Sequence, residues 1–121
     1  MNSFVFSAPT KVSFGFGVIN EIPNYLAELG KPKTMIVTDP GLYKAGVAEK
    51  VKQVLSKSRI ETVVFSEVEA NPRIQTVEKA ASIAAESKCG CIIGLGGGSS
   101  MDTAKMAATL LAHGGKYADY I

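Results

Sequence analysis

A glycine-rich segment offers the clearest chemistry in this sequence. Gly94–Ser99 reads G-L-G-G-G-S and lies between an apolar run and a segment with helical periodicity. Without Cβ atoms, such a turn lets a ligand approach the backbone, and the N–H groups and dipole of the following helix favour an anion such as pyrophosphate. Ser99 replaces the last glycine of the G-x-G-x-x-G pattern, and no G-K-[ST] follows, which disfavours nucleoside triphosphate hydrolysis. The alternative is a tight turn whose glycines serve packing alone.

Two polar residues near the start of the following helix have competing interpretations. Ser99 and Asp102 form S-x-x-D, a spacing in which the serine caps the helix and the carboxylate interacts with its dipole. The same residues could instead contact a cofactor. Because a carboxylate repels pyrophosphate, Asp102 would then meet a ribose hydroxyl or the nicotinamide.

Asp39 and Asn71 follow two other predicted strands, at residues 34–38 and 60–65. Ligands of open α/β sheets bind at the carboxyl-terminal edge, where the glycine-rich segment also lies. Asp39 could accept hydrogen bonds from an adenosine ribose, and its charge would repel a 2′-phosphate, which favours NAD over NADP. The alternative is that both residues form Asx turns into proline, since Asp39-Pro40-Gly41 and Asn71-Pro72 are turn signals.

Strand and helix patterns alternate along the chain. Strands are expected at 12–16, 34–38, 60–65 and 91–95. A helix with an apolar face is expected after each of them. The residues marking these helices are Ile19, Ile22, Leu26 and Leu29; Val47, Val51, Val54 and Leu55; Ile74, Val77, Ala81 and Ala84; and Met101, Ala104, Ala108 and Leu111. This order predicts a Rossmann-like α/β fold over residues 1–121, with a parallel sheet and helices on both faces.

Composition excludes several classes of protein. The 121 residues are 46% hydrophobic and 20% charged, as expected of one globular domain. A net charge of +2 gives no electrostatic footprint for nucleic acid. No apolar run approaches the roughly 20 residues that cross a bilayer, and the first residues lack the order of a signal peptide. We therefore expect a cytoplasmic protein without nucleic-acid or membrane partners.

The two cysteines, Cys89 and Cys91, are spaced C-G-C, which matches neither a redox pair nor a common zinc site. We expect both to be reduced and buried. If both lie on a strand, alternation places them on the same face.

Taken together, these segments resemble a known family. Residues 14–17 (F-G-F-G), Val37–Asp39, Asn71-Pro72 and the run G-G-G-S-S-M-D-T-A-K at residues 96–105 are similar, in order and spacing, to the iron-containing (group III) alcohol dehydrogenases. The resemblance covers essentially the whole chain. It implies a two-domain enzyme that transfers a hydride between NAD(H) and an alcohol or aldehyde. This chain would be its N-terminal NAD-binding domain, itself incomplete, and the helical metal-binding domain would be absent.

The resemblance also implies roles for individual residues. Asp39 would meet the adenosine ribose, and Asn71 would border the cofactor. Asp102 would approach the nicotinamide side. The pyrophosphate would be held by Gly97, Gly98 and Ser99.

In this family, one aspartate and three histidines beyond the glycine-loop helix hold iron or zinc. His113 is the only histidine here and cannot supply such a site. We therefore expect no catalytic or metal-binding residue in this chain, and no activity from it alone. The family often pairs subunits through its N-terminal β region, which makes Phe4–Phe16 a candidate homodimer contact.

Two other classes of function compete with this interpretation. The chain could be a non-catalytic nucleotide-binding module or a truncated pseudoenzyme, because every candidate residue serves binding. It could also be related to the dehydroquinate synthase-like lyases, which share the fold. The G-G-G-S-S-M-D-T-A-K form favours the alcohol dehydrogenases. The particular alcohol or aldehyde is not specified by these residues.

Overall fold

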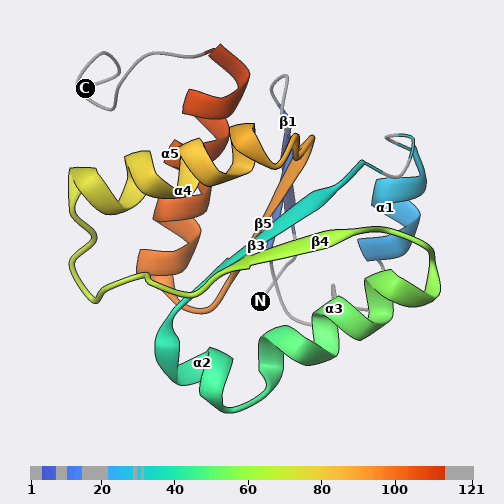
Figure 1. Ribbon diagram of the computed structural model, residues 1–121, viewed down its shortest axis with the longest axis horizontal. Helices are drawn as coiled ribbons and strands as arrows, with labels where there is room; N and C mark the ends of the chain where they lie inside the picture. The colour runs from blue at the N-terminus through green and yellow to red at the C-terminus, as the bar shows by residue number, and fades with distance from the viewer. Residues whose placement is uncertain (1–3, 8–10, 15–21, 29, 31, 114–121) are drawn as a thin grey trace.

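A computed structural model describes residues 4–7, 11–14, 22–28, 30 and 32–113 (Figure 1). The strands are β1 (Phe4–Ser7), β2 (Lys11–Phe14), β3 (Thr34–Thr38), β4 (Thr62–Phe65) and β5 (Cys91–Leu95). The helices are α1 (Ile22–Glu28), α2 (Pro40–Lys44), α3 (Val47–Lys57), α4 (Ile74–Glu86) and α5 (Gly98–His113). No helix within these ranges is both long enough and apolar enough to cross a bilayer.

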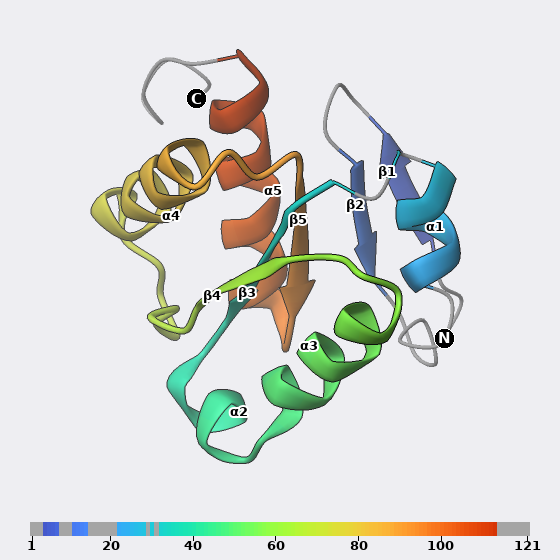
Figure 2. The ribbon, with the colours of Figure 1, turned by 45° about the vertical axis from the view of Figure 1, so that its right-hand side comes forward.

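The central feature is a three-stranded parallel sheet with the order β4-β3-β5. Val37 of β3 is level with Phe65 of β4 on one side and with Gly94 of β5 on the other. Strands β1 and β2 form a separate antiparallel hairpin that lies beside β5 (Figure 2). The predicted parallel sheet is confirmed for three of the four expected strands, whereas the strand expected at 12–16 pairs with β1 in the antiparallel hairpin. The first strand of the hairpin was not predicted, and the last two residues of the strand expected at 12–16 lie outside the described residues.

Helices cover both faces of this sheet, as predicted (Figures 1 and 2). Alternation along β3 sends Met35 and Val37 toward α4 and α5, and Ile36 toward α1 and α3. All five residues of β3 are buried, because the strand has a neighbour on each side and helices above and below. Most of the apolar residues predicted for the helix faces are buried or pack against the core. Val47 and Val54 are only half-buried, and Ile74 is 44% exposed. Ile19 and Leu29 lie outside the described residues.

Helices α3 and α4 end in the same way. After each helix, a basic residue adopts a left-handed conformation: Arg59 has φ 61° and Lys88 has φ 59°. The next residue then donates its N–H to the helix, from Ile60 to the Leu55 carbonyl and from Cys89 to the Ala84 carbonyl. This is the Schellman arrangement, which places an apolar residue against the last turn of the helix.

These helix ends correct two predictions. Ile60 belongs to the end of α3, so β4 begins at Thr62 and not at residue 60. Cys89 likewise belongs to the end of α4 and precedes β5. Both cysteines are free and buried, as predicted, but they lie in different apolar clusters on opposite faces of the sheet. The expectation that they share a face is wrong, because only Cys91 is a strand residue.

The left-handed conformation of Lys88 makes a stability prediction. A residue with a Cβ atom is strained at positive φ, whereas glycine is not. We expect Lys88→Gly to be more stable than Lys88→Ala by about 0.5–1 kcal/mol, and the alanine variant controls for the lost charge. Urea unfolding of both variants measures the difference. Equal stabilities would contradict the strain.

Candidate functional site

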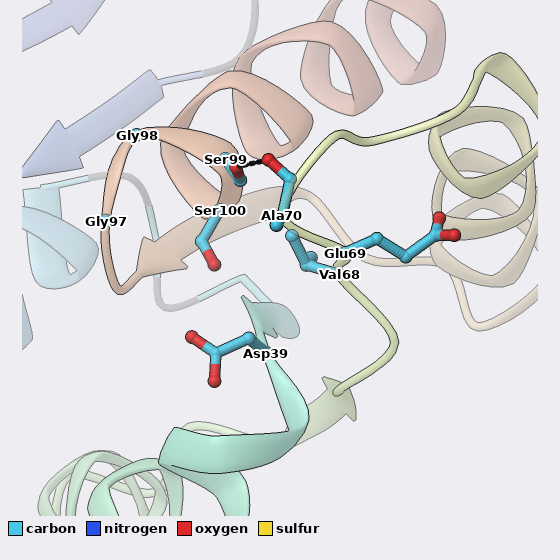
Figure 3. A pocket seen from close by; sticks show the side chains of 8 residues that line it. All are labelled: Asp39, Val68, Glu69, Ala70, Gly97, Gly98, Ser99 and Ser100. Atoms are coloured by element: carbon cyan, nitrogen blue, oxygen red, sulfur yellow. Dashed lines mark hydrogen bonds between the residues drawn. The ribbon is translucent and has the colours of Figure 1, made fainter.

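A pocket of about 300 Å³ lies at the carboxyl-terminal edge of the sheet (Figure 3). Three loops meet there, which follow β3, β4 and β5. Parallel strands end at one edge, so the loops after them converge even though they are far apart in sequence. The lining residues are Asp39, Val68, Glu69, Ala70, Gly97, Gly98, Ser99 and Ser100.

Asp39 follows β3 and has two roles in this arrangement. Its Oδ1 atom accepts a hydrogen bond from the N–H of Leu42 at 2.9 Å, so Asp39 is the N-cap of α2. The predicted turn at Asp39-Pro40-Gly41 is therefore the first turn of a short helix, with Pro40 at a position where a missing N–H costs little. The Asp39 carboxylate also lines the pocket. Capping and ligand contact are thus compatible here.

Gly96 forms the turn between β5 and α5. Its φ is 139°, and a Cβ atom at this position would come within 2.9 Å of Ser100 Oγ and 3.2 Å of Leu42 Cδ1. Only glycine fits both the conformation and the space. At Gly97 and Gly98, in contrast, an added Cβ would meet nothing within 4 Å. The open space over these two glycines leaves their backbone accessible to a ligand.

The predicted capping role of Ser99 is wrong. Helix α5 begins at Gly98, one residue before Ser99, and the Met101 N–H donates to the Gly97 carbonyl at 3.1 Å, which makes Gly97 the N-cap. The Ser99 hydroxyl instead donates to the Ala70 carbonyl at 2.6 Å (Figure 3). No acidic residue lies in the first turn, since Asp102 belongs to the second turn and is exposed.

The loop between β4 and α4 is held on its other side by Glu69. The Glu69 carboxylate accepts a hydrogen bond from the Thr76 hydroxyl and pairs with Arg73 Nε at 2.9 Å. In Figure 3 the Glu69 side chain points away from the pocket, toward α4. The Thr76 hydroxyl, together with the Arg73 guanidinium, holds the pKa of Glu69 below its ordinary value of 4.5. Glu69 therefore anchors the loop to the start of α4.

The structure brings together Asp39, Gly97, Gly98 and Ser99 of the six candidate residues. Asn71 is exposed and adjoins the pocket residue Ala70, but neither Asn71 nor Asp102 lines the pocket. The sequence interpretation missed four lining residues: Val68, Glu69, Ala70 and Ser100. Glu69 and Ala70 directly precede Asn71, so the turn at Asn71-Pro72 was the available signal.

The described residues contain no set of ligands for a metal ion. Within the described residues, no group of three or more histidine, cysteine, aspartate or glutamate side chains is arranged to hold one. The side chain of His113 lies outside what the structure describes. The pocket offers backbone amides, hydroxyls and a carboxylate, which are groups that recognise the phosphates and sugar of a nucleotide.

The fold and the pocket define a Rossmann-like α/β unit with a pocket at the carboxyl edge of its sheet. Residues 9–121 match the family described as iron-containing alcohol dehydrogenase, so the chain belongs to this family. It is 41% identical to a choline dehydrogenase from Bacillus subtilis over 115 residues. It is 36% identical to a long-chain-alcohol dehydrogenase from Geobacillus thermodenitrificans over 107 residues.

Solved structures agree with this assignment. An NADH-dependent butanol dehydrogenase from Thermotoga maritima superposes with a TM-score of 0.77 at 36% identity, over 96% of this chain and 29% of that one. A sulfoacetaldehyde reductase from Bifidobacterium kashiwanohense, in complex with NAD+, gives a TM-score of 0.76 at 29% identity, over 95% of this chain and 30% of that one. The alignments with the choline dehydrogenase and the long-chain-alcohol dehydrogenase cover 95% and 88% of this chain, respectively. The chain spans 29% and 27% of their lengths.

Alanine substitutions at Gly96 and Gly97 should have different effects on the free energy of unfolding. Gly96→Ala combines a strained φ with close contacts, so we expect a loss of about 1–3 kcal/mol in the free energy of unfolding. Gly97→Ala meets open space, and we expect a change within about 0.5 kcal/mol. Urea unfolding compares the two variants. A destabilised Gly97→Ala beside an unaffected Gly96→Ala would be incompatible with this turn.

Glu69 predicts a pH-dependent contribution to stability. Its folded pKa is lowered, so the carboxylate stabilises the fold above its unfolded pKa near 4.5, and this contribution is lost as the pH falls through the folded pKa. Glu69→Gln keeps an acceptor for Thr76 and removes the charge. The variant should be less stable than the parent at neutral pH, and the gap should close below pH 4.5. A gap that is constant with pH would exclude this role.

Proposed function

We propose that this chain binds the phosphates and ribose of NAD(H), as the coenzyme-binding part of an NAD-dependent alcohol dehydrogenase. One observation carries the proposal. The N-terminus of α5 and the Asp39 carboxylate line the same pocket. A helix N-terminus attracts phosphate, whereas a carboxylate accepts hydrogen bonds from sugar hydroxyls. A nucleotide presents both groups side by side.

The glycine-rich turn would hold the pyrophosphate through its backbone. The first N–H groups of a helix have no helical partner, and in α5 Met101 is the first whose N–H donates back to the turn. This leaves the amides of Gly98, Ser99 and Ser100 as donors for an anion. The open space at Gly97 and Gly98 supports the close approach that this requires.

Asp39 would bind the adenosine ribose by accepting a hydrogen bond from one of its hydroxyls. Its Oδ1 is engaged with Leu42, and its other oxygen remains to accept from a ribose hydroxyl. The Glu69 side chain points away from the pocket and pairs with Arg73, so Asp39 is the carboxylate that a ligand would meet there. Among the described residues, no cation lines the pocket. A 2′-phosphate would therefore meet repulsion without a compensating partner, which supports NAD over NADP.

Asn71 and Asp102 would act at the margins of the bound coenzyme. Asn71 belongs to the loop between β4 and α4, next to the pocket residue Ala70, so it would border the cofactor. Asp102 lies one helical turn into α5 and is exposed. We propose that it meets the nicotinamide side, where a carboxylate avoids the pyrophosphate.

The bound coenzyme would supply or accept the hydride, and this chain would orient it. The names of the relatives include butanol, choline and sulfoacetaldehyde, which supports a small alcohol or aldehyde as substrate. The described residues do not offer a ligand set for the metal expected of the family, iron or zinc. We propose that its ligands come from residues outside them. A cytoplasmic location and a homodimer contact at Phe4–Phe16 are further parts of this proposal.

The alternative is a nucleotide-binding module without turnover. The observation in its favour is that the pocket offers backbone amides, hydroxyls and a carboxylate, which are groups suited to binding a nucleotide. If the parent chain does not bind the coenzyme, both the dehydrogenase function and the nucleotide-binding module are excluded. Retained binding, with alcohol oxidation by the full-length polypeptide, would separate the enzyme from the module.

Coenzyme preference tests the role of Asp39. Asparagine retains the N-cap of α2 and removes the charge, so Asp39→Asn isolates the contact with the coenzyme. Titration by nicotinamide fluorescence should give tighter binding of NADH than NADPH to the parent chain. In the variant we expect the preference to fall roughly tenfold, through loss of repulsion and of a charged acceptor.

Asp39→Ala is the matched control, because it removes the cap as well. It should lose about 1 kcal/mol of stability in addition to the preference. An unchanged NADH preference in Asp39→Asn would contradict the ribose contact. Binding of neither coenzyme by the parent chain would contradict the proposed function itself.

A further inference from the structure

Two adjacent serines at the start of α5 have different surroundings. The Ser99 hydroxyl donates to the Ala70 carbonyl at 2.6 Å, across a separation of 29 residues in the chain. The Ser100 hydroxyl makes no hydrogen bond to any of the other seven pocket residues in Figure 3. Successive residues of a helix point about 100° apart, which explains how one side chain meets the β4–α4 loop and the other does not.

Ser100 is buried, yet it lines the pocket. Its exposed fraction is 2%, and its hydroxyl points toward the side of the pocket where Asp39 lies (Figure 3). Among the described residues, no side-chain nitrogen or oxygen is both sealed from solvent and without a partner. The Ser100 hydroxyl therefore reaches the pocket surface. A polar group that is held in a buried position without a protein partner costs free energy, which a ligand can recover.

The turn at Gly96 packs closely against Ser100 and fixes its position. A Cβ at Gly96 would lie 2.9 Å from Ser100 Oγ and 3.2 Å from Ser100 Cβ. Ser100 thus packs directly against Gly96 and lies within the first turn of a 16-residue helix. The free amides of this turn and the Ser100 hydroxyl are all donors, and the helix dipole adds a partial positive charge. Together they are suited to a phosphate oxygen.

We propose that Ser100 donates its hydroxyl to a phosphate oxygen of the bound dinucleotide, while the Ser99 hydroxyl only holds the β4–α4 loop in position. Ser99 then contacts phosphate through its backbone N–H alone. The assignment rests on the proposed function and refines it. Ser100 becomes a binding residue, and Ser99 becomes a positioning residue that acts through Ala70.

The two alanine variants of the whole chain form a matched pair. Each removes one hydroxyl from neighbouring positions of the same helix turn. Isothermal titration with NADH and with inorganic pyrophosphate measures the phosphate contact. Thermal unfolding without ligand measures the loop contact.

The expected effects are opposite in the two measurements. Ser100→Ala should weaken the binding of both ligands by about tenfold to a hundredfold, as for a lost hydrogen bond to a charged group, with an unfolding midpoint that is unchanged or higher. Ser99→Ala should lower the midpoint by about 3–6 °C, because it removes the hydrogen bond that ties α5 to the β4–α4 loop. Its affinity for pyrophosphate should change little, since the backbone donors remain.

Each other outcome is decisive. Equal binding of NADH by Ser100→Ala and the parent overturns the assignment and leaves the proposed function intact. If the parent binds pyrophosphate in a manner that depends on Ser100 but does not bind NADH, the phosphate contact stands and the coenzyme function fails. Binding of neither ligand by the parent overturns both. If Ser99→Ala, and not Ser100→Ala, loses the binding of pyrophosphate, the roles of the two serines are the reverse of those proposed.

Discussion

Helix α5 lies so close to strand β5 that the contact leaves room for no side chain at Gly94. A Cβ there would lie 3.0 Å from Ala104 Cβ and 3.3 Å from Met101 Cα. This approach leaves two residues, Gly96 and Gly97, to carry the chain from the strand into the helix. The positive φ of Gly96 makes such a short connection possible. The N-terminus of α5 is thereby aimed at the carboxyl edge of the sheet, where the other two loops arrive.

Hydrogen bonds between distant residues then fix the shape of that edge. The Thr38 hydroxyl donates to the Leu95 carbonyl at 2.8 Å and joins the ends of β3 and β5. Ser99 ties α5 to the loop after β4, and Glu69 ties the same loop to α4. The loop between β4 and α4 is therefore held from two directions. A site that is rigid before binding spends less free energy on ordering when a ligand arrives.

Much of the fold followed from local patterns. The bounds of β3 and β5 agree with the sequence interpretation because both are uninterrupted apolar runs. Local patterns failed where two local structures compete. Ile60 and Cys89 are apolar residues next to a strand, but each packs against the preceding helix in a Schellman arrangement. The required left-handed residues are Arg59 and Lys88, whose types give no signal for that conformation.

The sequence by itself determined the alternation of the longer strands and helices, the glycine-rich turn and the family, since these depend on periodicity and on short motifs. Only the tertiary structure decided which partner each polar side chain has. Ser99 matched a capping pattern, yet its hydroxyl bonds to Ala70, 29 residues away, and Ser100 faces the pocket instead. The reason is that a hydrogen bond across the fold depends on how α5 is seated on β5, a contact between surfaces that no local window of sequence contains.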